Sequence, residues 1–347
     1  MRFPITPCAI MRKFVNNKVV AYALAVLSLL FLFVTSLSCG SVSIPFGEVL
    51  SILAGGESEW TWNVIVLELR LPQALTAVLA GASISVAGLL LQTVLRNPLA
   101  GPEVLGVNSG AGLGVAVVML CGVASFALNG YWAVLGGALA GALLVMLVIM
   151  LLSTLLRNNM FLLIAGVAVS YLASSAITLL NYFSTAEGLQ SYTVWGMGDL
   201  GGVSMDKIAF FAPVILVLLF FSLIMMKPLN AMLAGDAYAV NLGINVKRVR
   251  GIALCVAGLL TAVVISFCGP VSFIGLAVPH IARISLRSNN HRHLIPSTII
   301  LGASVTLLCN IVCQLANSTT PLPLNAVTPL VGAPVIIYVV LKNKGLR

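Results

Sequence analysis

Residues 131–156 read YWAVLGGALAGALLVMLVIMLLSTLL and contain no charged side chain. An α-helix of this length rises ~39 Å, which is enough to cross a hydrocarbon core of about 30 Å. Similar runs occur along the whole chain of 347 residues, which is 60% hydrophobic and only 8% charged. A soluble domain needs far more polar surface than this composition supplies. The sequence therefore predicts an all-α polytopic membrane protein.

Ten apolar segments have the composition of membrane spans. They cover residues 19–38, 73–95, 104–121, 131–156, 160–182, 208–226, 251–268, 272–284, 294–316 and 325–341. Glycines break the third segment and the eighth is short, so the predicted count depends on these two. The predicted organisation is an N-terminal segment 1–18, a single membrane domain 19–341 and a tail 342–347.

The lysines and arginines sort to one side of the membrane when the chain crosses it at each predicted span. With a cytoplasmic N-terminus, 16 of the 18 basic residues lie inside, and only Arg70 and Lys207 lie outside. Because positive charge stays cytoplasmic during insertion, both termini are predicted to be cytoplasmic. Without the short span 272–284, Arg283, Arg287 and Arg292 would lie outside. The net charge of +9 therefore follows from topology and does not indicate nucleic-acid binding.

The acidic residues show the opposite distribution. Only Glu103 and Asp236 lie inside. The predicted outer loops hold Glu48, Glu57, Glu59, Glu68, Glu187, Asp199 and Asp206. This acidic outer face is a candidate docking surface for a partner.

Catalytic signatures are missing from the sequence. No lysine is followed by Ser or Thr, which excludes a Walker A phosphate loop. Ser109 lies among glycines and His280 lies near a span, but helix packing and a structural hydrogen bond explain them better than a protease site. His291 and His293 read as solvated loop residues. The chain is therefore predicted not to be an enzyme and to hold no metal or cofactor itself.

The predicted helix interiors contain no ionisable side chain that would bind a coupling ion. Their polar residues are uncharged: Gln92, Asn181, Asn310, Gln314 and Asn325. If the protein moves a solute uphill, the energy must come from another subunit. A secondary carrier of a hydrophobic solute and, less favoured, a membrane-embedded enzyme are the alternatives. Small-residue spacings such as Gly137–Gly141 predict tightly packed helices.

The longest polar stretch on the predicted inside is residues 227–250, KPLNAMLAGDAYAVNLGINVKRVR. Asn230 is predicted to cap a first short helix. Gly235 and Asp236 then break the chain before a second amphipathic piece that runs to Leu242. Two short helices joined at a glycine form a projection suited to a groove on a soluble partner. An ordinary interfacial loop is the equal alternative.

Five segments in family order carry a resemblance that spans nearly the whole chain. They are RLPQALTAVLAGASISVAGLLLQTVLRNPLAGPEVLGVNSGAGLG (Arg70–Gly114), YTVWGMGDLGG (Tyr192–Gly202), LAGDAYAVNLGI (Leu233–Ile244), GPVSFIGLAVPHIAR (Gly269–Arg283) and LVGAPVIIYVVLK (Leu330–Lys342). The chain closely resembles the FecCD-type permeases of iron–siderophore, haem and vitamin B12 ATP-binding-cassette importers.

The resemblance implies a ten-helix permease of the bacterial inner membrane that works as a symmetric pair. Two ATPase subunits, which hold the ATP and Mg, would bind below, and a periplasmic substrate-binding protein would dock above. The cargo would be a metal chelate, either an iron–siderophore, haem or cobalamin. The shared motifs do not distinguish among these three.

The resemblance also assigns residues. Coupling helices at about 228–246 would insert into the ATPase through Leu233, Ala234, Gly235, Asp236, Leu242 and Gly243. The cytoplasmic gate would lie near Asn97, Pro98, Asn159, Met160 and Phe161. Arg70 matches an outer arginine that pairs with a glutamate of the binding protein. Gln73 and Gln314 stand where relatives often have further arginines, so this chain departs from the usual docking pattern.

Overall fold

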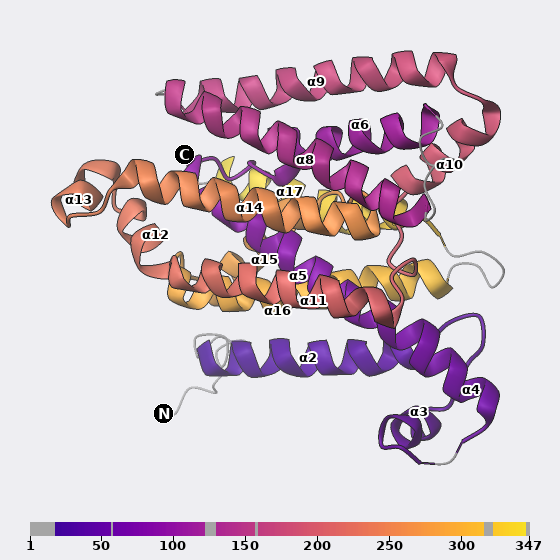
Figure 1. Ribbon diagram of the computed structural model, residues 1–347. Helices are drawn as coiled ribbons and strands as arrows, with labels where there is room; N and C mark the ends of the chain where they lie inside the picture. The colour runs from indigo at the N-terminus through magenta and orange to yellow at the C-terminus, as the bar shows by residue number, and fades with distance from the viewer. Residues whose placement is uncertain (1–17, 57, 122–129, 157–158, 316–321, 345–347) are drawn as a thin grey trace, which may run out of the picture.

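The computed structural model describes residues 18–344 except 57, 122–129, 157–158 and 316–321. Residues 1–17 of the predicted N-terminal segment 1–18, residues 345–347 of the tail and Glu57 thus lie outside the described residues. Within the described ranges the secondary structure is entirely helical. The long helices run side by side in one bundle, and α12 and α13 project from one of its ends (Figure 1).

Seven helices are long and apolar enough to cross a membrane in the described part of the chain, counting α4, η1 and α5 as one. They are α2 (Lys18–Ser38), α4 (Trp60–Val64) with the π-helical η1 (Ile65–Arg70) and α5 (Leu71–Val94), α8 (Gly130–Leu155), α9 (Asn159–Phe183), α11 (Met205–Ile224), α14 (Val246–Cys268) and α16 (His291–Leu315). Three further apolar helices are α6 (Val107–Leu120), α15 (Ile274–Leu286) and α17 (Leu324–Lys344). Every one of the ten predicted spans coincides with one of these helices.

Shorter elements connect the spans. They are α3 (Phe46–Leu53), the 3-10 turn η2 (Pro102–Leu105), α10 (Ala186–Gly196), α12 (Met226–Leu233) and α13 (Asp236–Asn241). α2 begins and α17 ends at the end of the bundle from which α12 and α13 project, whereas α3, α4 and α10 lie at the opposite end (Figure 1). The first end corresponds to the predicted cytoplasmic side and the second to the predicted outer side.

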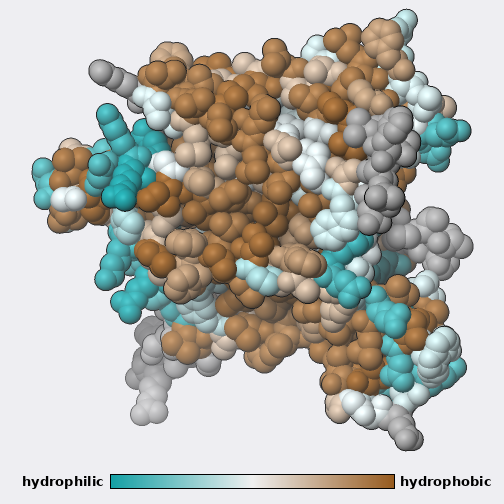
Figure 2. All heavy atoms as spheres, in the orientation of Figure 1, coloured by the Kyte–Doolittle hydropathy of each residue, from teal (hydrophilic) through white to brown (hydrophobic). Residues whose placement is uncertain are grey.

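The surface has the distribution of a membrane protein. Hydrophobic residues cover the middle of the bundle, and hydrophilic residues gather towards its two ends (Figure 2). Large apolar side chains such as Leu24, Leu147, Leu172 and Phe220 are exposed along the helices. A soluble monomer rarely exposes so much contiguous apolar surface, whereas lipid solvates it without cost. The chain is a multi-pass membrane protein.

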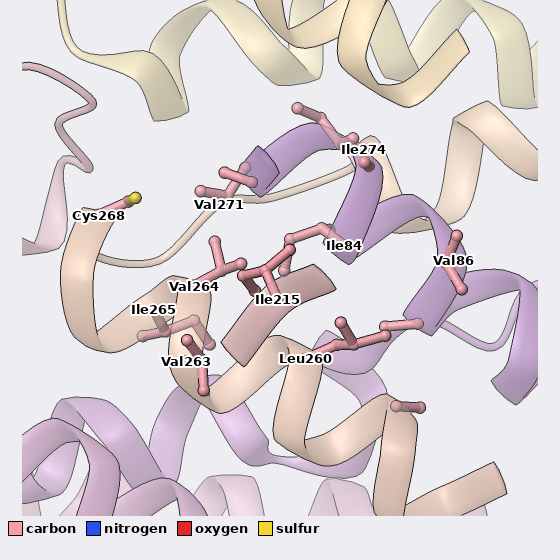
Figure 3. Close-up of a cluster of buried hydrophobic side chains, with 14 of the residues drawn as sticks. Ile84, Val86, Ile215, Leu260, Val263, Val264, Ile265, Cys268, Val271 and Ile274 are labelled. Carbon is pink, nitrogen blue, oxygen red and sulfur yellow. The ribbon is translucent and has the colours of Figure 1, made fainter. Parts of the chain in front are cut away.

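Helix α5 forms the centre of the bundle. It packs against α11, α14, α15 and α16. Its residue Ile84 joins Ile215 of α11, Leu260 of α14 and Ile274 of α15 in a buried apolar cluster (Figure 3). α5 and α15 approach so closely that a Cβ at Gly88 would lie 1.7 Å from the carbonyl oxygen of Gly275.

The predicted packing at Gly137–Gly141 is confirmed. Both glycines face α6, and a Cβ at Gly141 would lie 2.1 Å from the carbonyl oxygen of Gly110. Glycine is needed on α8 because the two backbones meet without intervening side chains.

Helix α9 contrasts with α5. Its main contacts are with α6, η2 and α8, and it does not pack extensively against α5. Tyr171, Leu172, Tyr182 and Phe183 are each more than 70% exposed. The mean hydropathies of the spans that contain α5 and α9 are nearly equal, so hydropathy alone does not show which of the two helices is buried by other helices.

Candidate functional site

The projecting pair α12–α13, here called the knob (residues 226–243), has the predicted break at its centre. Gly235 adopts φ +122°, a conformation that side chains with a Cβ rarely take, and no atom would lie within 4 Å of a Cβ there. Tyr238, Val240 and Leu242 are each more than half exposed. The knob projects from one end of the bundle (Figure 1), and these three side chains give it an exposed apolar face.

Ionic contacts hold α13 against the bundle. Asp236 accepts a 2.7 Å hydrogen bond from Arg96, which follows α5, and lies 3.6 Å from Arg250 of α14. One carboxylate thus joins the second half of the knob to two spans. The sequence carried a signal for this contact, because Asp236 is one of only two acids among the many predicted inner cations.

Polar contacts hold α12 as well, and here two predictions were wrong. Asn230 lies inside α12, not at its cap, and its Oδ1 accepts a 2.7 Å hydrogen bond from the backbone N–H of His291. His291 is not a solvated loop residue. It opens α16, is 1% exposed, and its Nε2 lies 2.9 Å from Thr93 Oγ1. These contacts link residues about 60 and 200 positions apart, which local sequence does not reveal.

The predicted gate residues fall in two places. Asn97 and Pro98 form the turn after α5, where Pro98 O lies 2.8 Å from His280 Nε2, so the structural hydrogen bond predicted for His280 is confirmed. Met160 and Phe161 open α9 and are 65% and 57% exposed. The side chain of Asn159 lies outside the described residues. α9 approaches the 97–106 segment further along, at Gly166, where a Cβ would lie 2.6 Å from Val104 O.

Arg70 does not present its charge on the surface. It is 6% exposed. Its guanidinium donates 2.8 Å and 3.0 Å hydrogen bonds to Leu37 O and Ser38 O and a further bond to Val42 O. The chain leaving α2 wraps over this side chain, so the guanidinium is turned away from the surface on which a partner would dock. Its evident role is to fasten the α2–α3 turn to the start of α5.

Gln73 and Gln314 lie together at the same end of the bundle. Gln314 Nε2 donates a 2.7 Å hydrogen bond to Gln73 Oε1, and Gln73 Nε2 donates a 3.1 Å bond to Asn310 Oδ1. Gln73 and Asn310 line a cavity of about 240 Å³ that also borders Asp199. Gln73 and Gln314, with Asn310, thus form one uncharged polar cluster.

The charges around that cluster are mainly acidic. Glu59, Glu68, Glu187, Asp199 and Asp206 are exposed. Lys207, the other predicted outer cation, donates a 2.8 Å hydrogen bond to Gly202 O and lies 3.5 Å from the centre of the Tyr131 ring. This end of the molecule therefore offers acceptors and negative charge.

Glu103 has a structural contact that the sequence did not indicate. Its Oε1 accepts a 2.6 Å hydrogen bond from the backbone N–H of Phe273, the residue that precedes α15 in a left-handed conformation. Burial raises the pKa of Glu103, and this hydrogen bond opposes the rise. The side chain fastens the turn between α14 and α15 to the η2 turn.

Within the described residues, no three His, Cys, Asp or Glu side chains lie close enough together to hold a metal ion. The features that the structure brings together are a jointed projection at one end, a polar cluster at the other, and apolar spans between them. This arrangement suits attachment to partners at both ends.

Comparison with known proteins agrees with this architecture. The chain is 34% identical over 315 residues to the vitamin B12 import system permease protein BtuC of Escherichia coli O9:H4 (strain HS), covering 89% of this chain and 95% of that protein. It is likewise 34% identical over 313 residues to BtuC of Shigella sonnei (strain Ss046), covering 88% and 94% of the two chains.

Among solved structures, an inward-facing metal-chelate-type ABC transporter superposes with a TM-score of 0.82 at 26% identity, covering 94% of this chain and all of that one. PsaBC from Streptococcus pneumoniae shares the fold at a TM-score of 0.50 and 12% identity, over 84% and 94% of the two chains. The model of the FecCD transport family matches residues 28–342. The chain belongs to the FecCD transport family.

Proposed function

We propose that this protein is the permease subunit of an ATP-driven importer that carries a metal chelate from the periplasm to the cytoplasm. It would reside in the bacterial inner membrane, as two copies bound to two ATP-binding-cassette ATPases and a periplasmic binding protein. The observation that carries the proposal is the family match over residues 28–342 in a chain that bears a jointed knob at one end. ATP and Mg would be bound by the ATPases.

The knob is proposed as the coupling element. Its exposed Tyr238, Val240 and Leu242 would fill a groove on the ATPase, in the way amphipathic helices fill grooves elsewhere. The proposed coupling residues are Leu233, Ala234, Gly235, Asp236, Leu242 and Gly243. Because Asp236 is bound to Arg96 and Arg250, a displacement of α13 would reach the ends of α5 and α14.

The transport pathway is proposed to lie between two copies of the chain. The exposed apolar faces of α9 and α17 would border it, as the fifth and tenth spans do in permeases of this type. Asn97, Pro98, Asn159, Met160 and Phe161 are proposed gate residues. Uncharged walls suit a bulky chelate of variable charge, since a fixed charge would hold it.

Docking of the binding protein is proposed at the opposite end, around Gln73 and Gln314. With Arg70 turned inward, recognition there would use hydrogen bonds and shape, with the exposed acids as the charged contribution. The cargo is proposed to be an iron–siderophore, haem or cobalamin. The curated relatives are vitamin B12 permeases, which makes a cobalamin the first substrate to assay.

The test is uptake of labelled chelates into vesicles that contain the chain with its ATPase and binding protein. We expect uptake that requires ATP and persists when ionophores remove ion gradients. Uptake that needs a gradient and survives depletion of ATP would select a secondary carrier. Native mass determination of the same complex should show two copies of this chain, and an active complex with one copy would contradict the proposed pathway.

A further inference from the structure

A polar cavity lies behind the knob, on the bundle side of α12. It has a volume of about 220 Å³. It is bordered by the end of α5 and the residues that follow it, by α12, by α15 and by the start of α16, and its polar and charged lining residues are Gln92, Thr93, Arg96, Arg283, Asn289 and His291. A water molecule occupies about 30 Å³ of the liquid, so the cavity has room for about seven waters or for a small solvated ion.

Arg283 contributes a cation to this cavity that has no carboxylate within 4.0 Å in the described part of the chain. Its Nη1 donates a 2.6 Å hydrogen bond to Gln92 Oε1, a neutral acceptor. Gln92 is itself held in place, because its Nε2 donates to Leu276 O at 3.2 Å. A guanidinium has five N–H donors, so most of those of Arg283 remain available to a ligand in the cavity.

The neighbouring charges do not neutralise Arg283. Arg96 lines the same cavity, and the nearby carboxylate of Asp236 is shared between Arg96 and Arg250. The other titratable side chains beside Arg283 are imidazoles, His280 and His291, which add no negative charge. The cavity lining thus contains two guanidinium groups, those of Arg96 and Arg283, and, among the described residues, no carboxylate. Asp236 lies outside the lining and pairs with Arg96, so Arg283 supplies the positive charge that is not neutralised.

The ligand that fits such a cavity is a compact oxyanion. Guanidinium groups bind phosphate oxygens through paired, charge-assisted hydrogen bonds, and the amide of Asn289 supplies a further donor. The lining also contains Met232, Leu233 and Leu294, which close the cavity on its apolar side. The cavity lies at the end of the bundle that carries most of the basic residues, which is the predicted cytoplasmic side.

We propose that this cavity binds a phosphate group between Arg283 and Arg96, either as inorganic phosphate or as the head group of an anionic phospholipid. A bound phosphate would link α15 to the end of α5 directly behind α12. It would therefore stabilise the base of the knob and reduce its mobility. The binding site itself does not depend on the transport function proposed above.

The first experiment measures thermal unfolding of the full-length protein in a zwitterionic lipid nanodisc while phosphate replaces chloride at constant ionic strength. We expect a saturable rise in Tm for the wild type. Arg283→Gln should weaken the apparent phosphate affinity by about tenfold or more, since one hydrogen bond to a charged group contributes about 1.5–3 kcal/mol. Arg292→Gln, which removes an exposed cation on the first turn of α16 that does not line the cavity, is the control and should leave the affinity unchanged.

A second arm separates the two sources of phosphate. Wild-type protein in nanodiscs with phosphatidylglycerol, compared with phosphatidylcholine, should show the rise in Tm without added phosphate if the head group is the ligand. Equilibrium dialysis with labelled phosphate gives a readout that does not depend on stability, and Arg96→Gln provides a second variant if Arg283→Gln does not fold. The proposal is overturned if neither phosphate nor phosphatidylglycerol binds to the wild type. It is also overturned if Arg283→Gln and Arg96→Gln both bind as tightly as the wild type.

Discussion

Glycine serves opposite purposes in the centre of the bundle and in the knob. At Gly88 the backbones of α5 and α15 touch, and a Cβ would overlap Gly275 O at 1.7 Å. At Gly235 there is no atom within 4 Å of a Cβ, and only the φ of +122° calls for glycine. The first position is constrained by its neighbours, whereas the second is constrained only by its own backbone.

The centre of the bundle around α5 is therefore a tightly packed region, whereas the knob is a projecting region whose two helices meet at one glycine. α5 is covered by other helices along most of its length. The knob is attached through polar contacts of Asn230 and Asp236 and through three buried apolar side chains, Leu229, Met232 and Ala239, while its outer face is exposed. Regions with few buried apolar contacts open at low free-energy cost, which is what a part that moves with a partner requires. Variants in each region should therefore fail in different ways.

The largest effect is expected for Gly88→Leu. Because the overlap is with backbone, α5 and α15 must separate, and the cost should exceed the ~1–3 kcal/mol usual for overpacking. We expect a large loss of folded protein and of Tm in detergent. Gly136→Leu on α8, where no atom would lie within 4 Å of the new Cβ, is the control and should fold normally. A well-folded Gly88→Leu protein would show that the packed region is looser than described.

The next effect is expected for Arg70→Met, at the outer edge of the packed region. The substitution leaves the carbonyls of Leu37 and Val42 without this donor, and Ser38 O keeps only the backbone N–H of Ile44, at a cost of about 1–3 kcal/mol. Tm should fall, with little change when salt is raised, because the contacts are buried. Lys207→Met, whose ammonium is partly exposed, should cost less than about 1 kcal/mol. A loss of binding-protein affinity without a loss of Tm would instead restore Arg70 as a docking residue.

Much of the fold could be predicted from the sequence because membrane insertion acts on local composition. Each span is recognised by its own apolar residues, and even the short α15 was required by the basic residues that follow it. The break at Gly235 was also local, since glycine next to a polar residue interrupts a helix. The glycine spacing of α8 predicted close packing because small side chains permit it wherever the partner lies.

The contacts between distant segments could not be predicted in the same way. The polar side chains of His291 and Arg70 were read as exposed because polarity usually indicates exposure. Both are buried because distant atoms form hydrogen bonds with them. For His291 these are in Thr93 and Asn230, and for Arg70 they are the last two carbonyls of α2 and that of Val42. A single sequence indicates that burying a polar side chain has a free-energy cost, but it does not show which distant residue will form the hydrogen bond that offsets this cost.

The third effect concerns the joint of the knob. Gly235→Val forces a β-branched residue into a backbone conformation that essentially only glycine adopts, at a cost of about 1–3 kcal/mol, without a neighbouring atom within 4 Å of the new Cβ. We expect normal insertion and a small fall in Tm, with loss of transport and of partner-stimulated ATP hydrolysis. Gly251→Val is the matched control, because Gly251 also has no neighbour within 4 Å but lies in a regular helix. Equal ATP hydrolysis in the two variants would contradict a coupling role for the joint.

The smallest effect is expected for the ionic contact that attaches the knob. Asp236 and Arg96 have side chains that are 40% and 47% exposed, and exposed pairs typically contribute about 0–1 kcal/mol. A double-mutant cycle with Asp236→Asn and Arg96→Gln should therefore give a coupling energy below about 1 kcal/mol in dilute salt, falling further as salt is added. The coupling is read from Tm, with Asp206→Asn, an exposed acid at the other end, as the control. A coupling above about 2 kcal/mol that persists in high salt would mean that the knob is fixed as firmly as the packed centre, and the distinction between the two regions would fail.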